Sequence, residues 1–433
     1  LNWIDVNNNY NPKNWELDTL SKRIISWISN SKLSYEDSDQ KYKDSFNTNI
    51  KKQVNHLINE INRSSWVDDK MIGCAAILLT GLSYKDEKYL NFGLSLLKKI
   101  INFSFDHEGF PKSRNIRQLA FYLKYFILIR EWLKESQNEI PEYLNEIIFL
   151  LGQSYNFIWQ EINKSLLFNG NHNSDNSDFD KYLKFHNYKF KNESKEIGGY
   201  AILKNKNIIL AVDIGHSPEK KFSHDYQSGA LSLEIYFKDT KLISNSGYFQ
   251  NYKHQLNSIS KSTATHSTLC MNNRSSCKFN KSSNGVLEIE KGIKVLKKNI
   301  IFEKDYWCVA GSHDGYLKKY GIIHERKIEF FSDLHKFKGI DKLVRKKNFK
   351  SSNFEIRFHF EPNAKITKTQ EGKSILIEID NSGWKFSCNN HLIDVETGLY
   401  FGNKNSFIEN QNIFISGITR NEDQEVQWEI TKI

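Results

Sequence analysis

Four side chains that can transfer a proton lie close together in the sequence between Phe222 and Cys277. They are His224, Tyr226, Tyr248 and His266. Imidazole and phenol groups are among those that proteins use as general acids and bases. Their types and spacing suit the removal of a weakly acidic proton from carbon.

These side chains flank a predicted β-strand. Apolar residues alternate with polar ones along it, as Leu231, Leu233, Ile235 and Phe237 against Ser232, Glu234 and Tyr236. A period of two is typical of a strand with one buried face. We therefore expect the candidate acid–base residues to be held on a β scaffold.

The first 165 or so residues have the periodicity of amphipathic helices. In one of them Phe46, Ile50, Val54, Leu57, Ile58 and Ile61 recur at spacings of three and four, which places them on one helical face. Further helices are predicted at Asp18–Asn30, Asp69–Leu82, Glu87–Phe103, Ile116–Lys134 and Pro141–Lys164. Their short connections favour antiparallel helical hairpins.

The periodicity changes after a polar, turn-forming run at Asn169–Asp180. Short β-rich runs follow at Ile208–Val212, Leu231–Phe237, Val286–Ile289, Ile322–Phe331, Phe354–Phe360, Ile375–Ile379 and Val426–Ile430. Helices followed by strands predict an α+β multidomain protein. We expect a helical domain at 1–168, a linker at 169–196 and an antiparallel β-sandwich at 197–433.

The composition is that of a globular protein. Its positive net charge has two explanations, an acidic partner or a general compositional bias. The chain has 433 residues, of which 39% are hydrophobic and 13% aromatic, enough for packed cores. A formal charge of +10 makes a polyanion a plausible partner. The lysines are also spread along the whole chain among many Asn and Ile residues, so compositional bias explains the charge equally well. The absence of a dense basic run or an aromatic-basic motif argues against a nucleic-acid partner.

Cysteines and chain ends give weaker indications. The cysteines Cys74, Cys270, Cys277, Cys308 and Cys388 form no CxxC pair and are expected to be buried thiols, with a single Cys270–Cys277 bridge left open. No apolar run reaches the roughly 20 residues needed to span a bilayer, so no integral membrane segment is expected. The sequence starts at Leu1, so we expect either a removed signal peptide or a fragment, with the helical domain truncated at its N-terminus.

Several motifs carry a resemblance to a known family. The runs HDYQSGALSLE, LISNSGYF and STATHSTL, in succession after a helical half, resemble the heparinase II/III family of polysaccharide lyases. The resemblance extends to HDG at His313, HERKI at His324, GIDKL at Gly339–Leu343 and RFHFEP at Arg357–Pro362. In the helical half, EGFPKSRN at Glu108–Asn115 and LLFNGN at Leu166–Asn171 look like family landmarks. The match is to the heparinase II/III-like branch.

This resemblance implies a fold, a reaction and a location. The fold is an incomplete (α/α) toroid followed by an antiparallel β-sandwich. The reaction is cleavage of an acidic, uronate-containing polysaccharide by β-elimination, which requires no metal or organic cofactor for its electron flow. The location is the periplasm or the cell envelope. The oligomeric state and the sugar are left open.

The resemblance also suggests roles for individual residues. His224, Tyr226, Tyr248 and His266 are the catalytic candidates, with a structural role for His266 equally open. Arg114 and Asn115 are expected to hold the uronate carboxylate, or else to take part in capping the helix that follows. Gln227 and His172 are further candidates for contact with the substrate.

Two positions depart from the family pattern. Characterised relatives carry an HxHxD-like run at the start of the signature strand, and some bind zinc there. Here Gln227 and Asn245 occupy positions where an imidazole and a carboxylate are expected, and only the adjacent His224 retains an imidazole in the first run. The zinc site of some relatives also uses the position of His266. Amides are poor zinc ligands, so we expect no tightly bound zinc.

Two alternatives to a lyase are open. A non-catalytic envelope protein of the same fold could use these residues to bind an acidic glycan. A glycoside hydrolase would need two opposed carboxylates, and only Asp106 and Glu108 form an acidic pair near a helical landmark, with no marked partner. We rank the hydrolase last.

Overall fold

The computed structural model describes residues 2–7, 9–159, 165–348, 350–369 and 372–433. Its internal contacts divide the chain into two compact units. The first consists of Leu1–Gly109 and Leu119–Gly152, and the second of Phe110–Gln118 and Gln153–Ile433. The KSRN motif therefore belongs to the second unit, as does the whole of segment 169–196.

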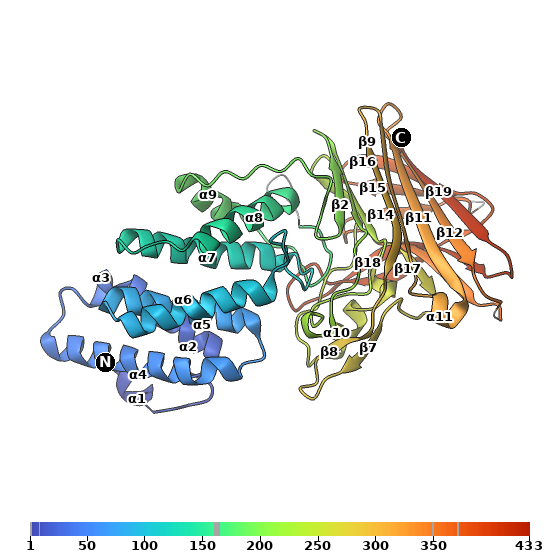
Figure 1. The fold of residues 1–433 in the computed structure, drawn as a ribbon. Coiled ribbons are helices and arrows are strands. Elements are labelled where there is room, and N and C mark those ends of the chain that lie inside the picture. Colours follow the sequence, from blue (N-terminus) through green and yellow to red (C-terminus); the bar gives the residue numbers. More distant parts are fainter. Residues whose placement is uncertain (1, 8, 160–164, 349, 370–371) are drawn as a thin grey trace. The chain divides into compact units, whose positions relative to one another are not determined.

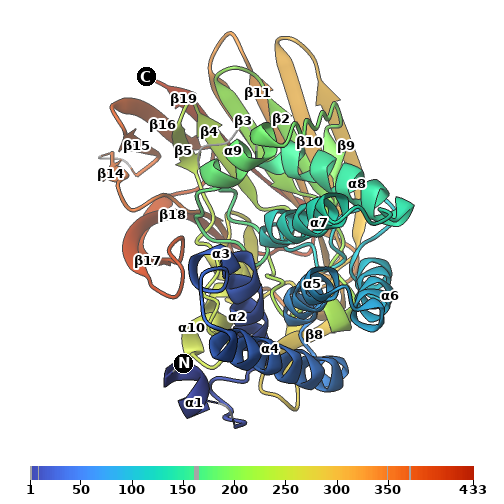
Figure 2. The same ribbon diagram turned by 90° about the vertical axis from the view of Figure 1, so that its left-hand side faces the viewer.

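The first unit is helical (Figures 1 and 2). Its elements are α1 (Asn2–Asn7), α2 (Leu17–Ser29), α3 (Ser31–Ser34), α4 (Gln40–Glu60), the 3₁₀ turn η1 (Ile61–Arg63), α5 (Val67–Tyr84), α6 (Glu87–Ser104) and most of α7 (Arg117–Glu135) and α8 (Glu142–Ile158). Six of these coincide with predicted helices, whereas the short α1 and α3 carry no predicted segment. The last residues of the predicted helix Pro141–Lys164 lie outside the described residues.

Helix α5 differs from the amphipathic helix predicted at Asp69–Leu82. Every residue from Met71 to Gly81 is buried, because α2, α4 and α6 all pack against it. The approach to α6 is close: a Cβ added at Gly81 would lie 2.7 Å from the backbone nitrogen of Leu90. A helix enclosed in this way has no solvent face for polar residues.

The second unit contains four antiparallel sheets. A five-stranded sheet has the order β1 (Glu196–Ile197), β2 (Tyr200–Lys204), β3 (Ile208–Asp213), β4 (Leu233–Phe237), β5 (Thr240–Ile243). An eight-stranded sheet has the order β14 (Lys365–Lys368), β15 (Ser374–Ile379), β16 (Ser382–Cys388), β19 (Gln424–Lys432), β12 (Lys336–Arg345), β11 (Ile322–Phe331), β10 (Tyr306–His313), β9 (Val295–Phe302). A four-stranded sheet has the order β17 (Ile393–Tyr400), β18 (Ile408–Ile418), β13 (Asn353–Phe358), β6 (Leu269–Met271), and β7 (Lys278–Lys281) pairs with β8 (Leu287–Lys291).

Short helices precede or join these strands. They are α9 (Ser177–Phe185), the 3₁₀ turn η2 (Lys220–Phe222), α10 (Gln255–Ser260), the 3₁₀ turn η3 (Thr263–Thr265) and α11 (Leu317–Tyr320). Helix α9 lies inside the segment for which the sequence indicates only a polar linker. Its Leu183 is buried, which supplies the apolar anchor that the composition of this segment conceals.

One large apolar cluster connects the three larger sheets. It includes Trp307, Trp384 and Trp428 together with aliphatic side chains from β3, β4, β13 and β18. Sheets joined through a shared apolar layer are the arrangement expected of a β-sandwich. The predicted order of a helical half followed by an antiparallel β half is thereby confirmed.

Strand β4 corrects one prediction. It begins at Leu233, because Leu231 adopts a left-handed conformation with φ of 58°. Both faces are buried, since Glu234 and Tyr236 are 0% and 2% exposed. The polar face is therefore enclosed, and its charge and hydroxyl must find partners inside the protein.

The five cysteines are free, buried thiols, so the bridge left open between Cys270 and Cys277 does not form. Among the described residues, no helix combines the length and the apolar character needed to cross a bilayer.

Candidate active site

The candidate site is a polar cluster centred on Asp225 in the second unit. Four segments supply it: the KSRN turn before α7, the loop between η2 and β4, the loop after β5, and helix α10. Asp225 itself has a side chain that is 24% exposed. It is therefore a carboxylate that can be reached from solvent yet is held by the protein.

Three neighbours hold the Asp225 carboxylate. Asn115 Nδ2 donates to Oδ2 over 2.8 Å, and the Arg117 guanidinium lies 3.4 Å from the same oxygen. The Tyr248 hydroxyl donates to Oδ1 over 3.1 Å. Burial alone would raise the pKa of Asp225, but the charges of Arg117, His224 and Lys261 outweigh it and bring the pKa below its usual value. Asp225 is consequently ionised at neutral pH.

Tyr248 is a buried member of the cluster, at 2% exposure. Its hydroxyl proton is shared between Asp225 Oδ1 and the carbonyl of His224, at 3.1 and 3.3 Å, and its oxygen accepts from Asn257 Nδ2 at 3.0 Å. Burial, and then the negative charge of Asp225, raise the pKa of Tyr248 well above its ordinary value. The phenol therefore stays protonated at neutral pH and acts as a donor.

Lys261 holds the backbone of the loop that carries His224 and Asp225. Its ammonium group donates to the carbonyls of His224 and of Leu287, the latter at 2.8 Å, and the residue is 1% exposed. Burial lowers the pKa of Lys261 to about 8, against the opposing influence of Asp225 and Glu288. The side chain of His224 itself is only partly buried.

His172 lies near the same cluster. Its Nδ1 is 2.8 Å from Gln250 Nε2, and it is partly buried. Burial lowers the pKa of His172 to about 4, and the positive charges of Arg117 and Lys404 add to the effect. His172 is therefore a neutral imidazole at neutral pH.

Arg114 is occupied by structural contacts. Its guanidinium forms a 2.8 Å ion pair with Asp213, lies over the Tyr200 ring, and donates to the carbonyls of Gly198, Gly199 and His216 at 3.0 to 3.2 Å. It is 7% exposed. Arg114, which was expected to hold the carboxylate of the substrate, therefore has a structural role. The arginine that lies beside Asp225 is Arg117, three residues later.

Asn115 has the capping role considered for it and a contact with Asp225, and it is too buried to hold a substrate carboxylate. Its Oδ1 accepts from the backbone nitrogen of Arg117 at 3.0 Å, at the start of α7, while its Nδ2 contacts Asp225. It is fully buried, so its amide positions Asp225 and is not exposed to a ligand. The fit is tight, because a Cβ at Gly170 would lie 2.6 Å from Asn115 Nδ2.

Gln227 joins three loops. Its Oε1 accepts from the Gly170 nitrogen at 3.1 Å, and its Nε2 donates to the carbonyls of Gly247 and Ser260 at 3.0 and 2.6 Å. It is 0% exposed. All of its amide groups are used internally, so the structure places Gln227 behind the Asp225 cluster as a support.

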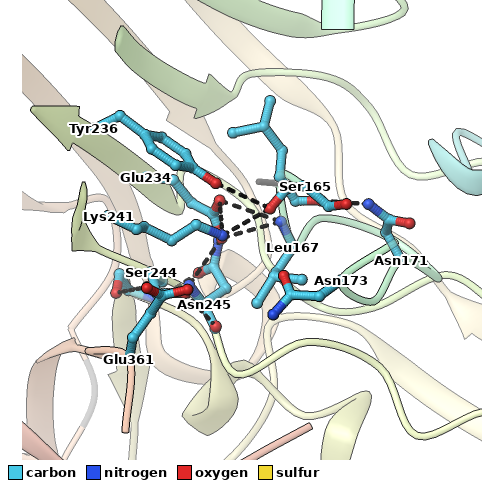
Figure 3. A network of polar contacts seen from close by, with 12 residues as sticks. Ser165, Leu167, Asn171, Asn173, Glu234, Tyr236, Lys241, Ser244, Asn245 and Glu361 are labelled. Atoms are coloured by element: carbon cyan, nitrogen blue, oxygen red, sulfur yellow. Dashed lines mark hydrogen bonds and ion pairs between the residues drawn. The ribbon is translucent and has the colours of Figure 1, made fainter. Parts of the chain in front are cut away.

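Asn245 belongs to a second buried network (Figure 3). Its backbone nitrogen and Nδ2 both donate to Glu234 Oε1, at 2.9 and 3.2 Å, and its Oδ1 accepts from Ser267 at 2.9 Å. Glu234 also pairs with Lys241 at 3.1 Å, with both side chains 0% exposed. Burial raises the pKa of Glu234, although Lys241 opposes this.

The segment around Ser165 completes this network. Lys241 Nζ donates to the Ser165 carbonyl at 2.7 Å, and the Tyr236 hydroxyl donates to the same oxygen at 3.2 Å, as Figure 3 shows. The Leu167 nitrogen donates to both oxygens of Glu234 at 3.1 Å. The buried side chains of Glu234 and Tyr236 in β4 therefore have hydrogen-bond partners inside the protein. An alternating pattern can for this reason occur in a strand that is buried on both faces.

Tyr226 and His266 lie away from the Asp225 carboxylate. Tyr226 is 0% exposed and packs in a small cluster with Ala230, Cys277, Ile289 and Ile293. His266 is 1% exposed, with Nδ1 2.9 Å from the Ser262 carbonyl, and burial lowers its pKa to about 4. The burial of Tyr226 and His266 favours a structural role for both side chains.

The positions of a family zinc site do not fit a metal ion here. Gln227 and Asn245 direct their carbonyl oxygens at backbone N–H groups, and His266 directs Nδ1 at a carbonyl. Within the described parts of the chain, no three His, Cys, Asp or Glu side chains are grouped so that they could hold a metal. The expectation of no tightly bound zinc stays a prediction.

Sequence reasoning missed Asp225, Arg117, Asn257 and Lys261 as members of the cluster. Arg117 and Asn257 lie in helices whose sequences indicate only periodicity, and Lys261 is one lysine among many. The single usable signal was the proximity of Arg117 to KSRN.

Comparisons with known proteins agree with this fold. Residues 193–429 match the family described as "Heparinase II/III-like, C-terminal". A crystal structure of heparinase III aligns with a TM-score of 0.77 at 13% identity, over 100% of this chain and 72% of that chain. A mutant of the heparan sulfate lyase HepC from Pedobacter heparinus aligns with a TM-score of 0.75 at 12% identity, over 99% of this chain and 71% of that one.

A further structure, a heparinase III gene product, aligns with a TM-score of 0.77 at 14% identity, over 97% of this chain and 68% of that one. At these identities the structures establish the fold alone. The comparison with curated proteins found no match. The family match spans more than half of the chain and includes the Asp225 loop, and we conclude that this chain belongs to the heparinase II/III-like family, a family of polysaccharide lyases.

Proposed function

We propose that this protein is a polysaccharide lyase that cleaves an acidic, uronate-containing polysaccharide by β-elimination. One observation carries the proposal: an ionised Asp225 gathers a partly exposed guanidinium, a partly exposed imidazole and a protonated phenol at one accessible place. Family membership supports the reaction class, and the net charge of +10 favours an acidic polymer.

The reaction requires three tasks. A base removes the proton from the carbon next to the uronate carboxylate, and the electron pair of that bond forms a carbon–carbon double bond. The bond from the neighbouring carbon to the glycosidic oxygen breaks, and that oxygen takes up a proton. Because the proton is weakly acidic, the carboxylate must be neutralised by a nearby donor or cation.

The Asp225 cluster offers a group for each task. Arg117, whose side chain is 30% exposed, is assigned to the uronate carboxylate. His224 is assigned to remove the proton and to return it to the leaving oxygen, because its imidazole is partly exposed and an imidazole can serve as both base and acid. Tyr248, which keeps its own proton, positions Asp225.

A second candidate function is favoured by a different observation. The amides of Gln227 and Asn245 are consumed by internal hydrogen bonds, where the family pattern has metal ligands. A cell-envelope protein that binds an acidic glycan without cleaving it would need only the exposed charges. The two functions differ in whether product forms.

The test is incubation with heparan sulfate, chondroitin sulfate, alginate and bacterial uronate polymers, followed by ultraviolet absorbance of the unsaturated product. We expect product from at least one polymer, and a loss of about 100-fold or more in kcat for His224→Ala. His107→Ala, which changes an exposed histidine in a turn outside the Asp225 cluster, is the matched control and should keep full activity. Binding of a polymer without product across the panel would favour the second candidate.

A further inference from the structure

A second site lies in the same unit and is lined in part by Ser258 of helix α10. It is a surface pocket of about 920 Å³, within the range of pockets that enclose small ligands. Its cationic lining consists of Arg274, Lys278, Lys291, Lys318 and Lys319, and Glu290 is its one carboxylate. This concentration of positive charge is the feature to be explained.

Most of this charge is uncompensated. Lys278 pairs with Glu290 at 2.7 Å. Arg274, Lys291, Lys318 and Lys319 have no carboxylate within ion-pair distance among the described residues. Arg274 and Lys319 are near enough that the arginine contributes to lowering the pKa of the lysine, after a larger contribution from burial. Like charges held together favour binding of an anion.

The fold fixes Arg274 in place. Asn272 and Asn273 both adopt left-handed backbone conformations, with φ of 51° and 53°, between the bridged residues Met271 and Arg274. The Arg274 nitrogen donates to the Met271 carbonyl at 2.9 Å. Two left-handed residues closing such a bridge are typical of a tight type I′ turn, for which asparagine is well suited. The backbone that carries the guanidinium is thus preorganised.

Neutral polar groups accompany the charges. The Tyr320 side chain lines the pocket, is 6% exposed, and its hydroxyl has no hydrogen-bond partner of ordinary geometry among the described residues. Ser258, Ser262 and Ser275 also line the pocket. Such hydroxyls can donate to and accept from the hydroxyls and acidic groups of a sugar.

The pocket is connected to the Asp225 cluster in two ways, through helix α10 and through Lys261. In helix α10, Asn257 contacts the Tyr248 hydroxyl, while the next residue, Ser258, lines the pocket. Lys261 donates to the carbonyl of His224 on one side and to that of Leu287, a pocket residue, on the other. A polymer that reaches one site is therefore close to the other.

We propose that this pocket binds acidic groups of a polysaccharide at a distance from the reacting bond, as a remote subsite. The proposal rests on the proposed function for its choice of polymer. Hydroxyls placed between cations suit a ligand in which sugar hydroxyls alternate with carboxylate or sulfate groups. A single partly exposed ring, Phe279, offers no platform for successive stacked bases, which disfavours nucleic acid.

The test is calorimetric titration with three hexasaccharides: one from alginate, carrying carboxylates only, one from heparin, carrying sulfates as well, and neutral maltohexaose. The variant Arg274→Glu/Lys319→Glu removes two unpaired cations. Its matched control is Lys304→Glu/Lys385→Glu, which makes the same change in net charge at exposed positions outside the pocket. Product formation is measured separately by absorbance.

We expect at least one acidic hexasaccharide to bind, and the pocket variant to bind it at least tenfold more weakly while the control changes less than twofold. Preference for heparin over alginate would identify sulfate as the group bound. The proposal is overturned by failure of both acidic sugars to bind, by equal binding of maltohexaose, or by an equal loss in the control. His224→Ala should keep this binding. Absence of product from the unmodified protein, with binding retained, would count against the lyase and not against the subsite.

Discussion

Asn115 Nδ2 donates a 2.8 Å hydrogen bond to Asp225 Oδ2, although the two residues are 110 positions apart in the chain. This bond ties the turn before α7 to the loop that carries His224. Because Asn115 also caps the first turn of α7, one buried amide positions both the helix and the carboxylate.

Removal of the Asn115 amide should weaken both the cap of α7 and the positioning of the Asp225 carboxylate. We expect Asn115→Ala to lower the free energy of unfolding by about 1–3 kcal/mol, through a lost cap and a less well bonded carboxylate. Urea denaturation measures the change, with Asn348→Ala at an exposed position as the control. Equal stability of the two variants would contradict a positioning role for Asn115.

Arg114 should prove more important for stability than for binding. Arg114→Met leaves Asp213 buried without its ion pair, for which we expect a loss of about 3–5 kcal/mol. Arg420→Met is the control: its side chain is 74% exposed and pairs with Glu422 at 3.6 Å, so the expected loss is below about 1 kcal/mol. Thermal unfolding compares them, and similar losses in the two variants would refute the structural assignment.

The buried pair Glu234–Lys241 should be strongly coupled. We expect Lys241→Met to destabilise the protein by about 3–5 kcal/mol, since Glu234 would then be a buried charge without its cation. In the double variant Glu234→Gln/Lys241→Met the loss should be smaller than the sum of the single losses. A double-mutant cycle measures this, and additive effects would show that the two side chains do not interact.

His266 predicts a pH dependence of stability. Burial lowers its folded pKa to about 4, whereas an unfolded histidine titrates near 6.5. Between these values only the unfolded chain binds the proton, so stability that is present above about pH 6.5 is lost as pH falls toward 4. The contribution of His266 to this loss is on the order of 3 kcal/mol.

His266→Gln should flatten this profile, as measured by urea denaturation at several pH values. His107→Gln, at an exposed position, is the control and should retain the slope of the parent protein. An unchanged slope in His266→Gln would show that His266 is not held neutral in the folded state.

Metal removal should have no effect on stability. Because Gln227 and Asn245 use their amide oxygens internally, we expect the purified protein to contain far less than one zinc per chain by elemental analysis. Dialysis against EDTA should leave the melting temperature unchanged. Stoichiometric zinc, or a melting temperature that falls on dialysis and returns with zinc, would contradict this.

The sequence by itself determined the order of the architecture and the family. Helical and strand periodicities are local properties, so α4, α6 and β11 could be predicted from neighbouring residues alone. The motifs between His224 and His266 identified the family for the same reason. Local patterns failed where burial is two-sided, as in α5 and β4, because the partner that encloses the second face is distant in the chain.

Only the tertiary structure decided which of the candidate residues work together. Arg114 and Arg117 are indistinguishable by type, yet one is buried against Asp213 and the other lies beside Asp225. Tyr226 and Tyr248 are equally plausible in the sequence, and only Tyr248 contacts a carboxylate. Such choices depend on contacts between residues about 20 to 110 positions apart, and on how far each side chain is removed from water, neither of which local sequence encodes.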